Sequence, residues 1–117
     1  MKKSRYVIPD ADRKRLAEDP WMITCKGLNE DMLVCTKKTQ EWHHALMYAG
    51  KRIQRWYAIV PLCTDCHRGD NGTIPLRNRG WAELQAMERD FNALQREHPK
   101  FNWEQRKKHL TNIFNLL

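Results

Sequence analysis

Four cysteines in a chain of 117 residues constrain this sequence more than any other feature. Cys63 and Cys66 form a Cys-x-x-Cys motif, and Cys25 and Cys35 precede it. Two thiolates at the spacing of this motif can bind one tetrahedral zinc ion at about 2.3 Å. Four thiolates complete such a site, and metal binding adds directly to the folding free energy of a small chain. We therefore expect a structural zinc ion at these four cysteines.

Other states of the cysteines stay open. Nine residues separate Cys25 from Cys35, whereas the first half of a zinc ribbon usually has two to four. A cross-strand disulfide between these two residues, or plain buried thiols, fits the same sequence. A redox-active motif is disfavoured because no βαβ pattern surrounds Cys63 and Cys66.

Length and hydropathy indicate one small domain. A chain of 117 residues that is 41% hydrophobic can build a modest core. Its longest largely apolar run, residues 56–63, is far shorter than the roughly 18 residues that a membrane span needs. The basic N-terminus has no apolar stretch of signal-peptide length behind it. We therefore expect a cytoplasmic protein without a membrane partner, where reducing conditions favour metal binding over disulfides.

The net charge of +7 is unevenly distributed. Residues 1–16 and 37–55 each carry a net charge of +4, and the acidic segment between them carries −3. A charge run alone indicates a solvated surface as readily as a binding site. A polyanion partner is the alternative, and the second basic stretch contains Lys51, Arg52 and Arg55, which the resemblance described below implies as DNA-binding residues.

The segment around the first two cysteines predicts a β-hairpin. Residues 21–25 and 32–35 are β-prone runs on either side of a turn-like stretch. With the turn centred on Glu30, Cys25 and Cys35 would face each other across the strands. A second hairpin is predicted from residues 40–45 and 56–60.

Helices are predicted at both ends of the chain. Residues 9–17 begin with proline and acidic side chains and predict a short helix. After the Cys-x-x-Cys motif, one helical face carries Trp81, Leu84, Met87, Phe91 and Leu94. Pro99 interrupts the chain, and Asn102 can cap a last helix with Gln105. The apolar side of that helix comprises Trp103, Leu110, Ile113, Phe114 and Leu117. We interpret both apolar stripes as core, with a protein partner as the alternative.

Histidines supply the candidate catalytic chemistry. Adjacent residues in a strand point to opposite sides, so one of His43 and His44 can bind a divalent metal while the other acts as a general base. His67 follows the second cysteine of the motif, and Asp70 or Asn71 lies one helical turn further on. This spacing lets His67 and an oxygen ligand meet at one metal ion.

Two segments, Glu-Trp-His-His-Ala at 41–45 and Ile-Val-Pro-Leu-Cys-Thr-Asp-Cys-His-Arg at 59–68, resemble the HNH nuclease family. The ββα-metal core of that family, also called the His-Me finger, holds one divalent ion between two strands and a helix. These two motifs are most similar to those of small phage and prophage HNH proteins, including a recombination-associated group. The resemblance covers residues 25–71, under half of the chain.

The resemblance implies a role for each residue. His43, His67 and Asn71 would bind the catalytic Mg²⁺ or Mn²⁺, and His44 would remove a proton from the attacking water. Arg68, or Lys51 and Arg52, would hold a neighbouring phosphate. The separate structural zinc would be bound by Cys25, Cys35, Cys63 and Cys66. No organic cofactor is implied.

The sequence departs from the family pattern at two positions. Ala58 stands where the family has its middle asparagine, so the hydrogen bond that braces the histidine loop must come from elsewhere or be absent. Lys38 stands where a second cysteine follows Cys35 in the family, which leaves Cys25 as the substitute.

We therefore predict an α+β fold in a single domain. A basic N-terminal segment with a short helix (1–20) would precede a zinc-stapled ββα-metal core (21–72), and a helical extension with two helices (73–117) would follow. The function expected is metal-dependent hydrolysis of DNA phosphodiester bonds in recombination or processing. The alternative is a non-catalytic HNH scaffold that binds DNA or a host protein.

Overall fold

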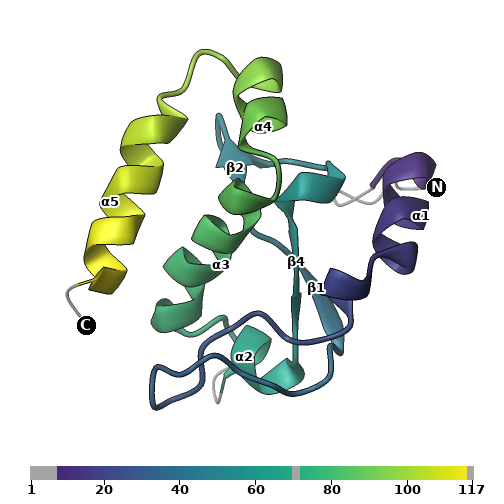
Figure 1. The fold of residues 1–117 in the computed structure, drawn as a ribbon, viewed down its shortest axis with the longest axis vertical. Helices are drawn as coiled ribbons and strands as arrows, with labels where there is room; N and C mark the ends of the chain where they lie inside the picture. The colour runs from purple at the N-terminus through teal and green to yellow at the C-terminus, as the bar shows by residue number, and fades with distance from the viewer. Residues whose placement is uncertain (1–7, 70–71, 116–117) are drawn as a thin grey trace.

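Two short antiparallel strands, β1 (Glu41–His44) and β4 (Ile59–Leu62), pair near the centre of the fold (Figure 1). The computed structural model describes residues 8–69 and 72–115, which form a small α+β domain. Every residue of β4 is buried, because helix α3 packs against this strand and the backbone N–H of Lys26 donates to the carbonyl of Pro61 at 2.8 Å.

The remaining elements of the described residues surround this pair. The α-helices are α1 (Asp10–Glu18), α2 (Thr64–Arg68), α3 (Leu76–Arg89), α4 (Phe91–Glu97) and α5 (Trp103–Asn115). The 3₁₀ turns are η1 (Pro20–Met22) and η2 (Trp56–Ala58), and a second sheet pairs β2 (Met47–Tyr48) with β3 (Lys51–Arg52). Helix α5 packs on the outer side of α3 (Figure 1). Buried side chains from α1 to α5 form one contiguous apolar cluster.

The first predicted hairpin is wrong in its detail. Residues 24–38 form a loop with two isolated antiparallel bridges, Thr24 with Lys38 and Leu28 with Val34, in place of two strands. This register centres the turn on Asp31, one residue later than expected. The cause is local, because the side-chain oxygen of Asn29 accepts hydrogen bonds from two backbone N–H groups of the turn.

The predicted pairing of the second hairpin forms, but its second strand starts three residues later than expected and ends at Leu62. His43 lies opposite Val60 and His44 opposite Ile59. Residues 56–58, expected to be strand, form η2 instead. The β2–β3 hairpin was not predicted, although Ala49-Gly50 supplies its two-residue turn.

The helical part contains one helix more than expected after residue 73. The apolar stripe from Trp81 to Leu94 is shared between α3 and α4, because Asp90 leaves helical geometry and its side chain caps α4 by accepting from Ala93 N. Asn102 caps α5 as expected, accepting from Gln105 N at 3.0 Å. The side chains of Trp103 and Leu110 are buried, whereas Ile113 is 41% exposed. Leu117 lies outside the described residues.

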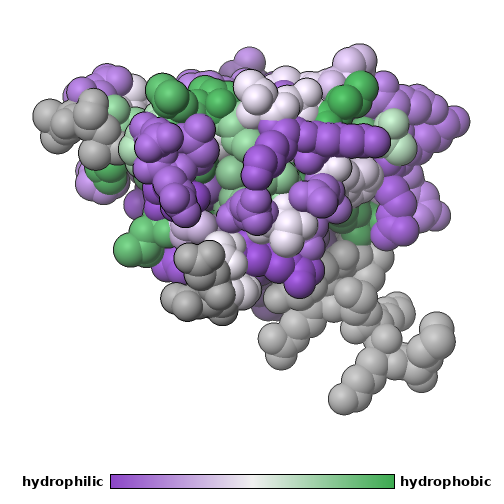
Figure 2. Space-filling model, turned by 90° about the horizontal axis from the view of Figure 1, so that it is seen from below, coloured by the Kyte–Doolittle hydropathy of each residue, from purple (hydrophilic) through white to green (hydrophobic). Residues whose placement is uncertain are grey.

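The face of the molecule drawn in Figure 2 is mainly hydrophilic. Figure 2 shows the face at the bottom of Figure 1, where exposed hydrophobic side chains lie in small groups among polar ones. Among the described residues, no helix has the length and apolar character that crossing a bilayer requires.

Candidate metal centre and histidine site

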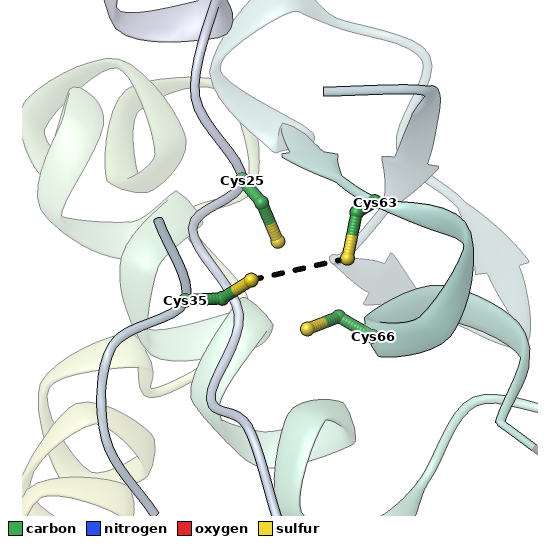
Figure 3. Close-up of side chains that lie close together, drawn as sticks. All are labelled: Cys25, Cys35, Cys63 and Cys66. Atoms are coloured by element: carbon green, nitrogen blue, oxygen red, sulfur yellow. Dashed lines mark hydrogen bonds between the residues drawn. The ribbon is translucent and has the colours of Figure 1, made fainter. Parts of the chain in front are cut away.

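All four cysteine side chains converge on one point (Figure 3). Cys25 and Cys35 come from the 24–38 loop, Cys63 precedes α2, and Cys66 lies within this helix. The four Sγ atoms lie within 4.8 Å of one another, and all four residues are buried. None of these cysteines is in a disulfide, so the predicted set of four is brought together as free thiols.

The sulfur geometry fits a tetrahedral metal ion. The Sγ atoms of Cys35 and Cys63 are 3.9 Å apart. A zinc ion bound to four sulfurs at about 2.3 Å places neighbouring sulfurs about 3.8 Å apart. The cluster can therefore hold a metal ion such as zinc in a closed site. Burial raises the pKa of the Cys25 and Cys66 thiols. At neutral pH these side chains therefore become thiolates only when a bound cation stabilises the negative charge.

Two residues that the sequence did not single out shape this cluster. A Cβ atom added at Gly27 would lie 2.9 Å from the Cβ and 3.1 Å from the Sγ of Cys66, so only glycine fits here. The fully buried Asn78 of α3 accepts from Leu28 N at 2.6 Å and donates to Leu28 O at 3.0 Å and Cys66 O at 3.1 Å. Asn78 thereby ties the cysteine loop and α2 to α3.

The histidine doublet faces two environments. His43 is buried, and its ring packs edge-on against the ring of His67 with centroids 5.0 Å apart. His44 Nε2 lies 3.2 Å from Oε1 of Gln54, which belongs to the segment after β3. Strand β1 thus places one ring beside α2 and the other beside the β2–β3 hairpin, as the alternation of a strand requires.

The electrostatics keep both rings of the doublet neutral. Burial, together with the neighbouring positive charges, lowers the pKa of His43 to about 3. Burial also lowers the pKa of His44, against the opposing hydrogen bond to Gln54. Nδ1 of His43 is buried and has no hydrogen-bond partner within residues 8–69 and 72–115. A neutral ring with an unsatisfied buried nitrogen is suited to binding a cation.

Glu41 is a functional candidate that the sequence reasoning missed. Its Oε1 accepts from His67 Nδ1 at 2.8 Å and from Arg68 Nε at 3.0 Å, and its Oε2 lies 2.6 Å from a terminal nitrogen of Arg68. The hydrogen bonds from Arg68 and His67 lower the pKa of Glu41, so this carboxylate stays ionised. A carboxylate on Nδ1 fixes the tautomer of a histidine and directs Nε2 to a metal.

The predicted phosphate-binding residues differ in their surroundings. Arg55 lies between Asp12 and Glu97, at 2.7 and 2.9 Å, and Arg68 is paired with Glu41. A terminal nitrogen of Arg52 donates to the His44 carbonyl at 3.4 Å. Lys51 is exposed, with no hydrogen-bond or ion-pair partner in the part of the chain that the structure describes. Asn71 lies outside the described residues.

The loop after His44 is braced by backbone. Ala58 is fully buried in η2, and its carbonyl accepts from Ala45 N at 2.8 Å. The contact of Arg52 with the His44 carbonyl adds a second link from the β2–β3 hairpin. Both hydrogen bonds tie the end of β1 to the segment at residues 52–58.

No protein-family model, no curated protein sequence and no solved structure matches this chain.

Proposed function

We propose that this chain is a divalent-metal-dependent endonuclease of the HNH type that hydrolyses phosphodiester bonds in DNA. The observation that carries the proposal is the pairing of His43 on β1 with His67 on α2, ring centroids 5.0 Å apart, with Glu41 fixing His67. The resemblance to the HNH family implies a metal site between two strands and a helix, and these two histidines lie on a strand and a helix.

The residues present fit a divalent cation. Nδ1 of His43 is a buried acceptor without a partner among the described residues, and the hydrogen bond to Glu41 leaves Nε2 of His67 as the ligand atom. We assign Asn71 as the third ligand on the resemblance alone. When bound, Mg²⁺ or Mn²⁺ supplies positive charge that stabilises the charge developing on the phosphate. The zinc that we place at the four cysteines is structural.

His44 is the proposed general base. With Nε2 donating to Oε1 of Gln54, the proton sits on Nε2 and the lone pair on Nδ1. His44 then takes a proton at Nδ1 from the water that attacks the phosphodiester. The lowered pKa of His44 keeps the ring unprotonated at neutral pH, so that it can accept a proton.

The cations around His44 are the proposed phosphate contacts. Lys51 and Arg52 are both exposed on β3, beside the strand that carries His44. Because they belong to the hairpin that contacts His44, a DNA backbone held by them would run past the general base. Arg55 and Arg68 are paired with carboxylates, so they would contribute less to phosphate binding.

A second candidate function is binding without hydrolysis. It is favoured by the buried Ala58 at the position of the family's middle asparagine. Such a protein would keep the zinc-stapled scaffold to bind DNA or a host protein, with α5 and its 41% exposed Ile113 as a protein-binding surface.

Cleavage assays separate the two candidates. Zinc-loaded protein is incubated with supercoiled plasmid and with single-stranded DNA, in Mg²⁺, in Mn²⁺ and without either ion. His44→Ala is the test variant, and His109→Ala, an exposed histidine on α5, is the matched control. The nuclease proposal expects metal-dependent cleavage by wild type and His109→Ala only. Mobility shifts without cleavage by any of these proteins would favour the binding candidate.

A further inference from the structure

We infer that a cleft beside His44 binds one unpaired nucleotide next to the scissile phosphate, and hence that the substrate is single-stranded or locally unpaired DNA. The inference rests on the proposed nuclease function. The cleft has a volume of about 740 Å³ and lies between the β2–β3 hairpin and the end of α4. It is lined mainly by Tyr48, Lys51, Arg52, Gln54, Arg55 and His98.

The cleft is joined to the proposed general base. Gln54 lines the cleft and also holds Nε2 of His44 at 3.2 Å. Arg52 lines it and donates to the His44 carbonyl at 3.4 Å. A ligand in the cleft therefore lies one side chain away from His44.

An aromatic pair in the cleft suits a nucleobase. The rings of Tyr48 and His98 lie with centroids 4.8 Å apart and planes tilted by 44°. Both residues are half-buried, and neither the Tyr48 hydroxyl nor the His98 ring has a hydrogen-bond partner in the described parts of the chain. Such rings can stack on any base, and the polar groups at their edges can hydrogen-bond to it.

The charges of the cleft suit a phosphate. Lys51 supplies a cation with no ion-pair partner among the described residues. The one carboxylate in the lining, Glu97, accepts from Arg55 at 2.9 Å and from the Tyr57 hydroxyl at 3.0 Å. Arg55, which also contacts Asp12, offsets part of the charge of Glu97, and Lys51 and Arg52 add two further positive charges to the lining.

The volume and the aromatic rings of the cleft favour a single unpaired nucleotide. A volume of about 740 Å³ is that of a pocket for one small organic ligand. In a duplex, both faces of a base are covered by the neighbouring base pairs. Stacking on Tyr48 also requires a base whose face is uncovered.

Binding to fluorescent oligonucleotides tests the inference without relying on cleavage. Anisotropy is measured in the His44→Ala background, zinc-loaded and without added Mg²⁺, on a single strand, on the same strand with one abasic position, and on the matching duplex. We expect the single strand to bind more tightly than the duplex. Tyr48→Leu, which keeps apolar volume but removes the ring, should weaken single-strand binding about tenfold. Tyr48→Phe should keep most of the affinity.

Variants of the cleft are compared with variants of exposed residues on α5, which lie outside the cleft lining. His98→Ala should weaken single-strand binding, whereas His109→Ala on α5 should not. Lys51→Ala should reduce the slope of log affinity against log salt by about one, and exposed Lys108→Ala should change affinity less. Equal affinity of Tyr48→Leu and its parent, with folding verified by circular dichroism, would overturn the inference. Cleft-dependent binding by a wild-type protein that cleaves nothing would uphold the cleft and refute the nuclease proposal.

Discussion

The carboxylate of Glu41 accepts a hydrogen bond from Nδ1 of His67 at 2.8 Å, linking the first residue of β1 to α2 across the proposed metal site. Removing this charge should weaken divalent-metal binding. For Glu41→Gln we expect a 10- to 100-fold loss of Mn²⁺ affinity, measured by isothermal titration calorimetry on zinc-loaded protein. Glu104→Gln on α5 is the control. Unchanged Mn²⁺ affinity in Glu41→Gln would show that this carboxylate does not orient a ligand.

The four cysteines should contain about one zinc ion per chain after purification without chelators. Cys66→Ser should lose this zinc, and the free energy of unfolding should fall by about 4 kcal/mol or more, because loss of a structural metal is among the most destabilising changes. Metal analysis and urea unfolding measure the two effects. A Cys66→Ser protein with unchanged stability would contradict a stabilising metal at this cluster.

Gly27→Ala should impair the same cluster without removing a ligand. Its new methyl group would meet Cys66 at 2.9 Å and push the 24–38 loop away from α2. We expect lower zinc occupancy and a loss of about 2 kcal/mol in stability. Gly72→Ala, at a position with open space but a positive φ of 73°, controls for backbone strain alone and should keep its zinc.

The amide of Asn78 should carry a large share of the stability. It is fully buried and makes three hydrogen bonds to Leu28 and Cys66. Asn78→Ala leaves these backbone groups unpaired, so we expect a loss of about 3 kcal/mol in urea unfolding. Asn112→Ala, on the exposed side of α5, should change stability by no more than about 0.5 kcal/mol.

Stability should fall with acid through His43. Its folded pKa of about 3 lies below the ordinary value of 6.5, so between these values the unfolded chain binds the extra proton. The stabilisation is present above pH 6.5 and is lost as the pH falls toward 3. His43→Asn should remove much of this dependence between pH 6.5 and 4.5, measured as the difference from wild type at each pH. An identical pH profile for both proteins would contradict a buried, neutral His43.

The sequence predicted the parts of the site whose chemistry is carried by residue type. Thiols have few uses at such spacings, so the four-cysteine cluster could be anticipated from the residues. That His43 and His67 would lie together was an expectation from the resemblance to the HNH family, and their rings are 5.0 Å apart. Glu41 and Asn78 could not be anticipated, because each acts through a partner 26 or 50 residues away that only the fold brings near. The break between α3 and α4 was missed because Asp90 interrupts the helix without disturbing its apolar spacing.

The most direct test of the nuclease account is the initial rate of DNA cleavage in Mn²⁺ by zinc-loaded wild type and by His44→Ala. A positioned general base contributes about 10²- to 10⁴-fold, so His44→Ala should cleave at least about 100 times more slowly while binding DNA equally well. Equal cleavage rates for the two proteins, or no cleavage by wild type on any DNA substrate in Mg²⁺ or Mn²⁺, would contradict the account.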